Sequence, residues 1–162
     1  MAPQRPRQIK REIRALGVAA RQKSGGITVV GVVYRGNLWL DGILRAHSEG
    51  DDITQTIADM LTGSSHNGQV RVILLSHDKL PAGVTLSAAE LHAKTGKPVI
   101  ILGDSEGFRW KKGGEEVWFS AEGLGRWSAE SILNTSTRGS VVPEALRVAV
   151  LTLSALPDGM DA

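Results

Sequence analysis

The chain has 162 residues, of which 41% are hydrophobic and 22% charged, and this composition predicts one globular domain with a sizeable core. The absence of cysteine excludes a disulfide framework, a thiolate metal site and a cysteine nucleophile. The opening sequence MAPQRPRQIKREIR lacks the apolar stretch of a secretory signal, and no segment offers the roughly 18 apolar residues of a membrane helix. We therefore expect a soluble cytoplasmic protein with no membrane partner.

Positive charge is concentrated at the start of the chain. Up to residue 23, seven Lys and Arg residues oppose the single Glu12, which leaves +6 there and −4 over the remainder. A basic arm over residues 1–12 can contact nucleic-acid phosphates. The alternative is a solvated charged terminus without a ligand. The residues predicted to bind nucleic acid in this arm are Arg5, Arg7, Lys10 and Arg11. We expect the single domain over residues 13–157 and a short tail over 158–162.

Three strands are predicted first. Residues 13–20 form an apolar run, and the stretch RQKSGG after it indicates a turn. The β-branched run ITVVGVVY, residues 27–34, is typical of a strand covered on both faces. A short turn at 35–37 then leads into LWLDGIL, residues 38–44, so we expect three antiparallel strands.

Helices and strands alternate over the next part of the chain. Asp51 or Asp52 is expected to cap a helix that ends near Gly63, and the run QVRVILL after it predicts a strand. A capping box at Ser87 begins a second helix, which Gly96 ends before the strand KPVIIL. This alternation predicts a mixed α/β sheet with three antiparallel strands followed by parallel strands, covered by helices, and it resembles ribonuclease H.

The remaining elements are a hairpin and two helices. FRWKKGGEEVWF, residues 108–119, predicts a hairpin that turns at two glycines on the edge of the sheet. A helix is expected over 128–134. The closing segment VVPEALRVAVLTLSAL predicts a helix with Pro143 in its first turn and a wide apolar face, which we expect to be largely buried.

Five phrases in order resemble one archaeal family. They are IRALGVAA, GVVYRGNLWLDGIL, QVRVILLSHDKLPAG, TGKPVI and RGSVVPEALRVAVL. The family is catalogued as domain of unknown function ninety-nine, and its fold is ribonuclease-H-like and similar to endonuclease V. The resemblance covers nearly the whole chain. It implies a fold first and an activity second, because fold alone is a weak guide to function.

The resemblance also indicates where metal ligands would stand. Endonuclease V holds a divalent metal with carboxylates, one on the first strand and another at the end of the fourth. Family members read Gly-Ile-Asp-Asp-Gly or similar on the first strand, where this chain has Ala19 and Ala20 in place of both acids. The usual Asp-Gly at the end of the fourth strand aligns with Ser76 and His77. Two-metal hydrolysis of the endonuclease V kind is therefore not expected.

Ser76, His77 and Asp78 are adjacent, but they do not predict a hydrolase triad. A triad needs the imidazole between the serine oxygen and the carboxylate, whereas neighbouring strand residues point to opposite faces. The G-x-S-x-G elbow is also missing. His77 and Asp78 stay as candidate catalytic residues, with His77 as an acid or base. The alternative, which we favour, is that Ser76 and Asp78 cap backbone groups.

A rebuilt metal site is the second candidate. Asp104 and Glu106 follow the fifth strand at the carboxyl edge of the sheet and could join Asp78 in holding Mg²⁺ or Mn²⁺. The alternative is a solvated loop without a ligand. The four histidines occur singly, so zinc is not expected. Asp41, beside Gly42, is expected to be a turn or bulge residue.

The segment FRWKK interleaves aromatic and basic side chains and could stack bases while it contacts phosphates. The predicted binding residues there are Arg109, Trp110, Lys111 and Lys112. The alternative is an ordinary hairpin in which Trp110 packs opposite Trp118 and the lysines face water.

Together these patterns predict an endonuclease-V-like domain that has lost its metal carboxylates, needs no cofactor, and binds DNA, RNA or a protein partner. The alternative is a divalent-metal-dependent nuclease with a rebuilt carboxylate site. A structural or assembly role is a third hypothesis, which depends on exposed tryptophans lying together on one surface.

Overall fold

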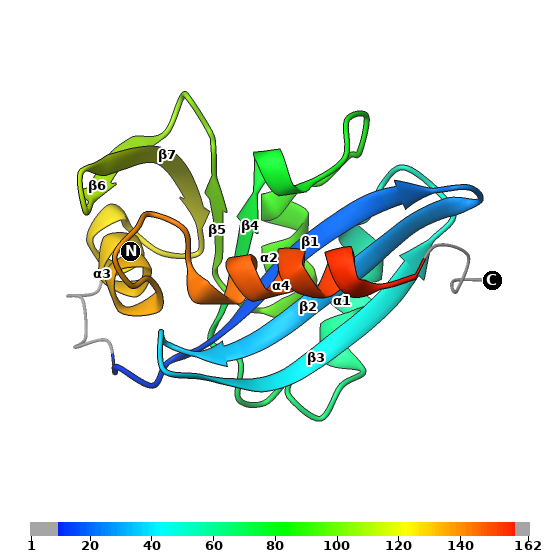
Figure 1. Cartoon of the computed structure of the whole chain (residues 1–162), viewed down its shortest axis with the longest axis horizontal. Helices are drawn as coiled ribbons and strands as arrows, with labels where there is room; N and C mark the ends of the chain where they lie inside the picture. The colour runs from blue at the N-terminus through cyan, green and yellow to red at the C-terminus, as the bar shows by residue number, and fades with distance from the viewer. Residues whose placement is uncertain (1–9, 158–162) are drawn as a thin grey trace.

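A computed structural model describes residues 10–157, which form a seven-stranded sheet with helices on both faces (Figure 1). The strand order is β3-β2-β1-β4-β5-β7-β6. The predicted mixed α/β sheet is confirmed, because both antiparallel and parallel pairs occur in it. No helix within the described range combines the length and the apolarity that a membrane crossing requires.

The first three strands form an antiparallel meander, as predicted: β1 (Arg14–Lys23), β2 (Gly26–Arg35) and β3 (Trp39–Ser48). The expected end of the first strand was wrong. Arg21 to Lys23 continue β1 and pair with Gly26 to Thr28, because Ser24 and Gly25 alone make the turn. Gly25 and Gly26 have φ of 91° and 148°, a backbone conformation that favours glycine.

Two parallel strands follow in the middle of the sheet: β4 (Val72–Ser76) pairs with β1, and β5 (Val99–Leu102) pairs with β4. Helices α1 (Thr54–Thr62) and α2 (Ala88–Thr95) cover one face of the sheet. The capping box expected at Ser87 is present, whereas the N-cap residue of α1 is Ile53 rather than Asp51 or Asp52, and it makes no side-chain capping bond. Asp52 accepts a hydrogen bond from the Thr54 backbone N–H at 3.0 Å, and the Ser87 side chain accepts one from the Glu90 N–H. Gly96 ends α2 in the left-handed conformation, with φ of 72°.

The edge hairpin consists of β6 (Phe108–Lys112) and β7 (Glu115–Glu122), with β7 antiparallel to β5. Helices α3 (Arg126–Ser136) and α4 (Glu144–Ala155) cover the other face (Figure 1). The expectation that the closing helix is largely buried holds for only one face, since Leu151 is 55% exposed.

Helix α4 lies directly on β1. A Cβ atom added to Gly17 would lie 2.4 Å from the backbone carbon of Ala145, so only glycine permits this approach. Successive β1 residues alternate between the two faces. Leu16, Val18 and Ala20 pack under α1 and α2, whereas Ala19 packs against α4. The helix thus covers the face of β1 on which the family resemblance places a metal ligand.

Candidate functional site

The family resemblance places a metal carboxylate at the end of β4. Ser76 is the last residue of β4, and residues 77–79 form a single 3-10 turn after it. Ser76 is buried, and its hydroxyl donates a hydrogen bond to the Asp78 carboxylate. The expectation that Ser76 caps a backbone group is therefore wrong, because its side chain makes no capping bond.

Asp78 points outward from this edge and is held ionised. Its side chain is 70% exposed and lies 3.4 Å from the Lys79 ammonium. The hydrogen bond from Ser76 lowers the pKa of the Asp78 carboxyl, burial opposes this, and the Lys79 charge adds to the lowering. Because Ser76 contacts Asp78 directly, with no imidazole between them, no serine-histidine-aspartate relay forms. His77 lies instead beside Gly103.

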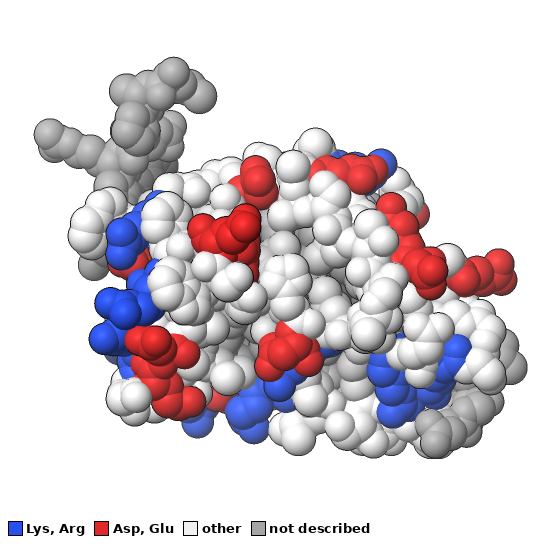
Figure 2. Space-filling view, turned by 90° about the horizontal axis from the view of Figure 1, so that it is seen from above, with Lys and Arg blue, Asp and Glu red and all other residues white. Residues whose placement is uncertain are grey.

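Asp78 and Lys79 line two hollows. The larger, of about 380 Å³, lies between the end of β1 and the C-terminal half of α4. The smaller, of about 200 Å³, has Ser76 at one end and mostly apolar walls that include Leu102 and Leu146. Acidic and basic side chains are interspersed over the face of the molecule that Figure 2 shows.

The strand opposite Ser76 offers no carboxylate. Gly17 pairs with Leu74, so Ala19 and Ser76, each two residues further on, share the face that α4 covers. Ala19 is fully buried among the side chains of Ala145, Ala149 and neighbours. Ala20 points to the opposite face, so only one of the two replaced acids would have faced Ser76.

The proposed replacement ligands do not fit a divalent metal. Within residues 10–157, no three His, Asp or Glu side chains lie close enough together to hold an ion. Asp104 uses one carboxylate oxygen to accept the Glu106 backbone N–H at 3.0 Å, which closes its own loop. The structure therefore does not assemble Asp78, Asp104 and Glu106, or His77, into a ligand set for Mg²⁺ or Mn²⁺.

The β6–β7 hairpin forms as expected, with the Lys111 side chain 65% exposed, but without the expected tryptophan pair. Trp110 pairs with Val117, not with Trp118, and it is only 9% exposed because it belongs to the core under α3. Trp110 is therefore unsuited to stacking on bases, and the expected Trp110–Trp118 pair is wrong. Arg109 and Lys111 point to the other face, where each lies within 4.0 Å of the Glu116 carboxylate.

Lys112 supports the hairpin. Its ammonium donates to the carbonyl oxygens of Asn134 and Thr137 at the C-terminal end of α3, at 3.0 and 3.3 Å, and to the Thr137 hydroxyl at 2.9 Å. The lysine thus satisfies carbonyl groups that a helix end leaves without partners. This local role competes with the predicted contact to a phosphate.

The basic arm is described only at its end. Lys10 and Arg11 are exposed, whereas Arg5 and Arg7 lie outside the described residues. The Ile13 N–H donates to the Lys10 carbonyl, and the Gly36 N–H donates to the Ile13 carbonyl at 2.7 Å. These bonds attach Lys10 and Arg11 to the turn between β2 and β3.

Asp41 forms a charged cluster that the sequence alone did not reveal. As expected, it is the bulge residue of β3, because Val33 pairs with Gly42 and Tyr34 pairs with Leu40. The bulge turns its carboxylate between Arg14 and Arg35, each at 2.8 Å. Burial raises the pKa of Asp41, but the hydrogen bonds and charges of Arg35 and Arg14 outweigh it and lower the pKa.

Comparison with known proteins assigns the chain to a family. The family described as endonuclease dU matches residues 11–107, which is more than half of the chain. The chain belongs to the endonuclease dU family. The expected resemblance to an archaeal endonuclease-V-like family is thereby confirmed, since its curated relatives come from archaea.

Two relatives illustrate this membership. A UPF0215 protein from Methanosarcina acetivorans is 30% identical over 177 residues, covering 88% of this chain and 90% of the relative. A UPF0215 protein from Methanothermobacter thermautotrophicus is 31% identical over 187 residues, covering 94% and 92%. The similarity therefore spans nearly the full length of both chains.

Two solved structures share the fold of this endonuclease dU family member. A protein of unknown function from Archaeoglobus fulgidus superposes with a TM-score of 0.72 at 21% identity, covering 88% of this chain and 97% of the other. Endonuclease V from Bacillus subtilis superposes with a TM-score of 0.60 at 11% identity, covering 94% and 83%. At these identities the likeness concerns the fold alone.

Proposed function

We propose that this chain binds nucleic acid and does not cleave it with a carboxylate-held metal. The observation that carries the proposal is Ala19, fully buried under α4 at the position where the resemblance places a metal ligand. A hydrolytic Mg²⁺ or Mn²⁺ site needs several carboxylate oxygens around the scissile phosphate. This edge of the sheet supplies a serine hydroxyl and one outward-pointing aspartate instead.

Binding is supported by the family and by charge. The family description names an endonuclease that acts on dU, and endonuclease V, which shares the fold, is named for the same class of reaction. Up to residue 23 the chain carries an excess of six positive charges. A protein that keeps basic residues but lacks metal ligands retains the electrostatic part of nucleic-acid binding, which salt weakens.

The test combines a binding and a cleavage measurement on the same wild-type protein. Fluorescence anisotropy with labelled single- and double-stranded oligonucleotides should show binding at low salt that weakens as salt rises. Strands that contain dU or inosine should stay intact with Mg²⁺ or Mn²⁺ present. Failure to bind any of these strands at low salt would contradict the binding half of the proposal.

The cleavage half has its own control. Metal-dependent cleavage that Asp78→Asn abolishes, while Glu115→Gln on the exposed hairpin retains it, would establish the rebuilt-site alternative instead. The two substitutions each remove one exposed carboxylate, so they are matched in charge.

A further inference from the structure

Three residues form a continuous row across the antiparallel strands. Arg14 on β1 pairs with Arg35 on β2, and Arg35 pairs with Trp39 on β3. Directly paired residues point to the same face of a sheet, so their side chains are neighbours. The Arg35 guanidinium accordingly lies over the Trp39 ring, 5.4 Å from its centre. This face is the one that α1 and α2 cover further along the strands.

The row continues past β1 to two more cations. The Arg71 N–H donates to the Arg14 carbonyl at 2.9 Å, which extends the β1–β4 ladder by one residue. Ile73 on β4 pairs with Val99 on β5. Arg71 and Lys97 each stand two residues before these partners, so Lys97 is the neighbour of Arg71 in the same register. Burial and the nearby Arg71 charge both lower the pKa of Lys97, in agreement with this proximity. We call Trp39, Arg35, Arg14, Arg71 and Lys97 the basic row.

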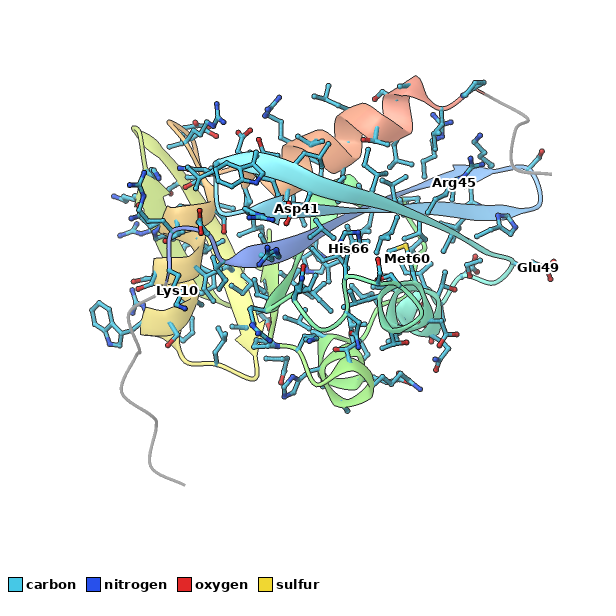
Figure 3. The ribbon with its side chains drawn as sticks, turned by 90° about the horizontal axis from the view of Figure 1, so that it is seen from below. Lys10, Asp41, Arg45, Glu49, Met60 and His66 are labelled. Atoms are coloured by element: carbon cyan, nitrogen blue, oxygen red, sulfur yellow. The ribbon has the colours of Figure 1, made fainter. Side chains whose placement is uncertain are left out.

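The basic row is accessible and carries excess positive charge. Arg71 is exposed, the Arg14 and Arg35 side chains are 25% and 30% exposed, and Trp39 is 45% exposed. Asp41 offsets one of the four cations. Figure 3 shows Asp41 on the part of β3 nearer to Lys10, with Glu49 toward the opposite end of the strand.

The end of the basic arm is attached beside the row. A Cβ atom added to Gly36 would lie 2.0 Å from the Arg11 carbonyl oxygen, which shows how closely residues 10–13 pack on the turn that follows Arg35. Lys10 and Arg11 therefore extend the positive surface, and Glu12 is the acid among them.

The spacing of the row suits an extended polyanion. Neighbouring strands lie about 4.8 Å apart, so five residues in register span roughly 19 Å. Guanidinium groups pair with phosphate oxygens in a fixed geometry. An exposed tryptophan at one end offers a flat surface for a base, and only an unpaired base can present its ring face to it.

We propose that the basic row binds single-stranded nucleic acid, with phosphates on its guanidinium groups and an unpaired base on Trp39; the Lys97 ammonium donates to the Asn67 carbonyl at 2.7 Å and adds positive charge beside them. This inference rests on the proposed function and names the surface and the strandedness of its ligand. The surface lies at the end of the sheet where β1 begins. It is separate from the β4 edge with Ser76 and from the β6–β7 hairpin at the far side of the sheet.

The experiment compares two pairs of matched variants in the full chain. Trp39→Ala is paired with Trp127→Ala, since both side chains are exposed but Trp127 lies on α3. Arg71→Ala is paired with Arg126→Ala, an exposed arginine on α3. The probe is a labelled single-stranded oligonucleotide longer than the roughly 4–16 nucleotides that such surfaces occupy, with its duplex as comparison. Circular dichroism and thermal melting check that each variant folds.

Trp39→Ala should weaken single-strand binding by about tenfold or more, as expected for one stacked base. Arg71→Ala should reduce the slope of log affinity against log salt by about 0.7, the share of one phosphate contact on a single strand. Both controls should bind like wild type, and the duplex should bind more weakly than the single strand.

Two results would overturn the inference without touching the proposed function. In the first, Trp39→Ala and Arg71→Ala both bind the single strand as tightly as wild type does. In the second, the wild-type protein binds the duplex more tightly than the single strand. Wild-type protein that binds neither form would overturn both proposals together. If one row variant fails to fold, the other still decides the outcome, because Trp39 and Arg71 stand at separate points of the row.

Discussion

Asp41 and Asp78 are both held below the ordinary pKa of an aspartate, but by opposite surroundings. Asp41 is only 14% exposed and lies between two arginines at the end of the sheet where β1 begins. Asp78 is 70% exposed at the end of β4, where a serine hydroxyl and one lysine contact it. At the end of β4, where the family resemblance places a metal ligand, Asp78 thus lies on the outside, whereas Asp41 is enclosed by its charged partners at the other end.

The two ends of the sheet thus differ in the side chains that they carry. Under α4 the position on β1 where the resemblance places a metal ligand is filled by Ala19, which packs against Ala145 and Ala149. The other end retains cations in register across the sheet. The proposed binding surface and the β4 edge therefore occupy separate parts of the fold, so substitutions can address each of them independently.

Returning the missing acid to β1 should have the largest effect. Ala19→Asp would bury a carboxylate without a partner against Ala145 and Ala149, and we expect it to lower the free energy of unfolding by on the order of 3–5 kcal/mol. Urea denaturation at neutral pH measures this. The matched control Ala82→Asp, at an exposed turn, should change it by less than about 0.5 kcal/mol. Equal stability of Ala19→Asp and wild type would show that α4 leaves room for a carboxylate.

Removing the acid at the other end should have an intermediate effect. Asp41→Asn breaks charged hydrogen bonds to Arg14 and Arg35 and should lower the free energy of unfolding by about 1–3 kcal/mol at pH 7. Because the folded pKa of Asp41 is lowered, its contribution is complete above the unfolded pKa of about 3.9 and is lost as pH falls through the lower folded value. The difference between variant and wild type should therefore shrink below about pH 4.

The same variant tests the basic row with the opposite sign. Asp41→Asn removes a negative charge from the row, so it should tighten single-strand binding and steepen its salt dependence even as the fold weakens. The exposed Asp51→Asn serves as the control for charge alone. Weaker binding by Asp41→Asn, with the fold intact, would mean that Asp41 positions the arginines for their ligand.

The smallest effect is expected at the β4 edge. Ser76→Ala removes the hydrogen bond that lowers the pKa of Asp78, so this pKa should rise toward about 3.9 in an NMR titration of the carboxyl group. Stability should change by no more than about 0.5 kcal/mol, since Asp78 is largely exposed. Ser105→Ala, on a neighbouring exposed loop, should leave the Asp78 pKa unchanged. An unchanged pKa in Ser76→Ala would assign the lowering to Lys79.

Most of the fold could be predicted because its signals are local. The β-branched run of β2, the capping serine of α2 and the glycine that ends it each specify their own element. The cross-strand partner of Trp110 could also have been predicted. A two-residue turn at Gly113 and Gly114 pairs residue 112 with 115, which places Trp110 opposite Val117.

The candidate site was less predictable because its contacts join distant strands. The contact between Arg14 and Asp41 depends on the bulge that turns Asp41 inward, and no sequence signal fixes that direction. Arg71 lies beside Arg14 only because β1 and β4 pair in parallel. A long connection joins these two strands, so no local turn in the sequence specifies their register. The absence of the two carboxylates, by contrast, could be predicted from the sequence, because the side chains of Ala19 and Ala20 carry no oxygen.

The close contact of Gly17 with Ala145 has a consequence for the order of folding. The meander of β1, β2 and β3 consists of near neighbours in the chain and can form early, but one face of β1 is completed only by α4, which comes far later. Until α4 arrives, Ala19, Val30 and Val32 stay uncovered on a ready-made sheet. Productive folding therefore depends on how quickly this helix reaches the sheet before another chain covers the same apolar surface.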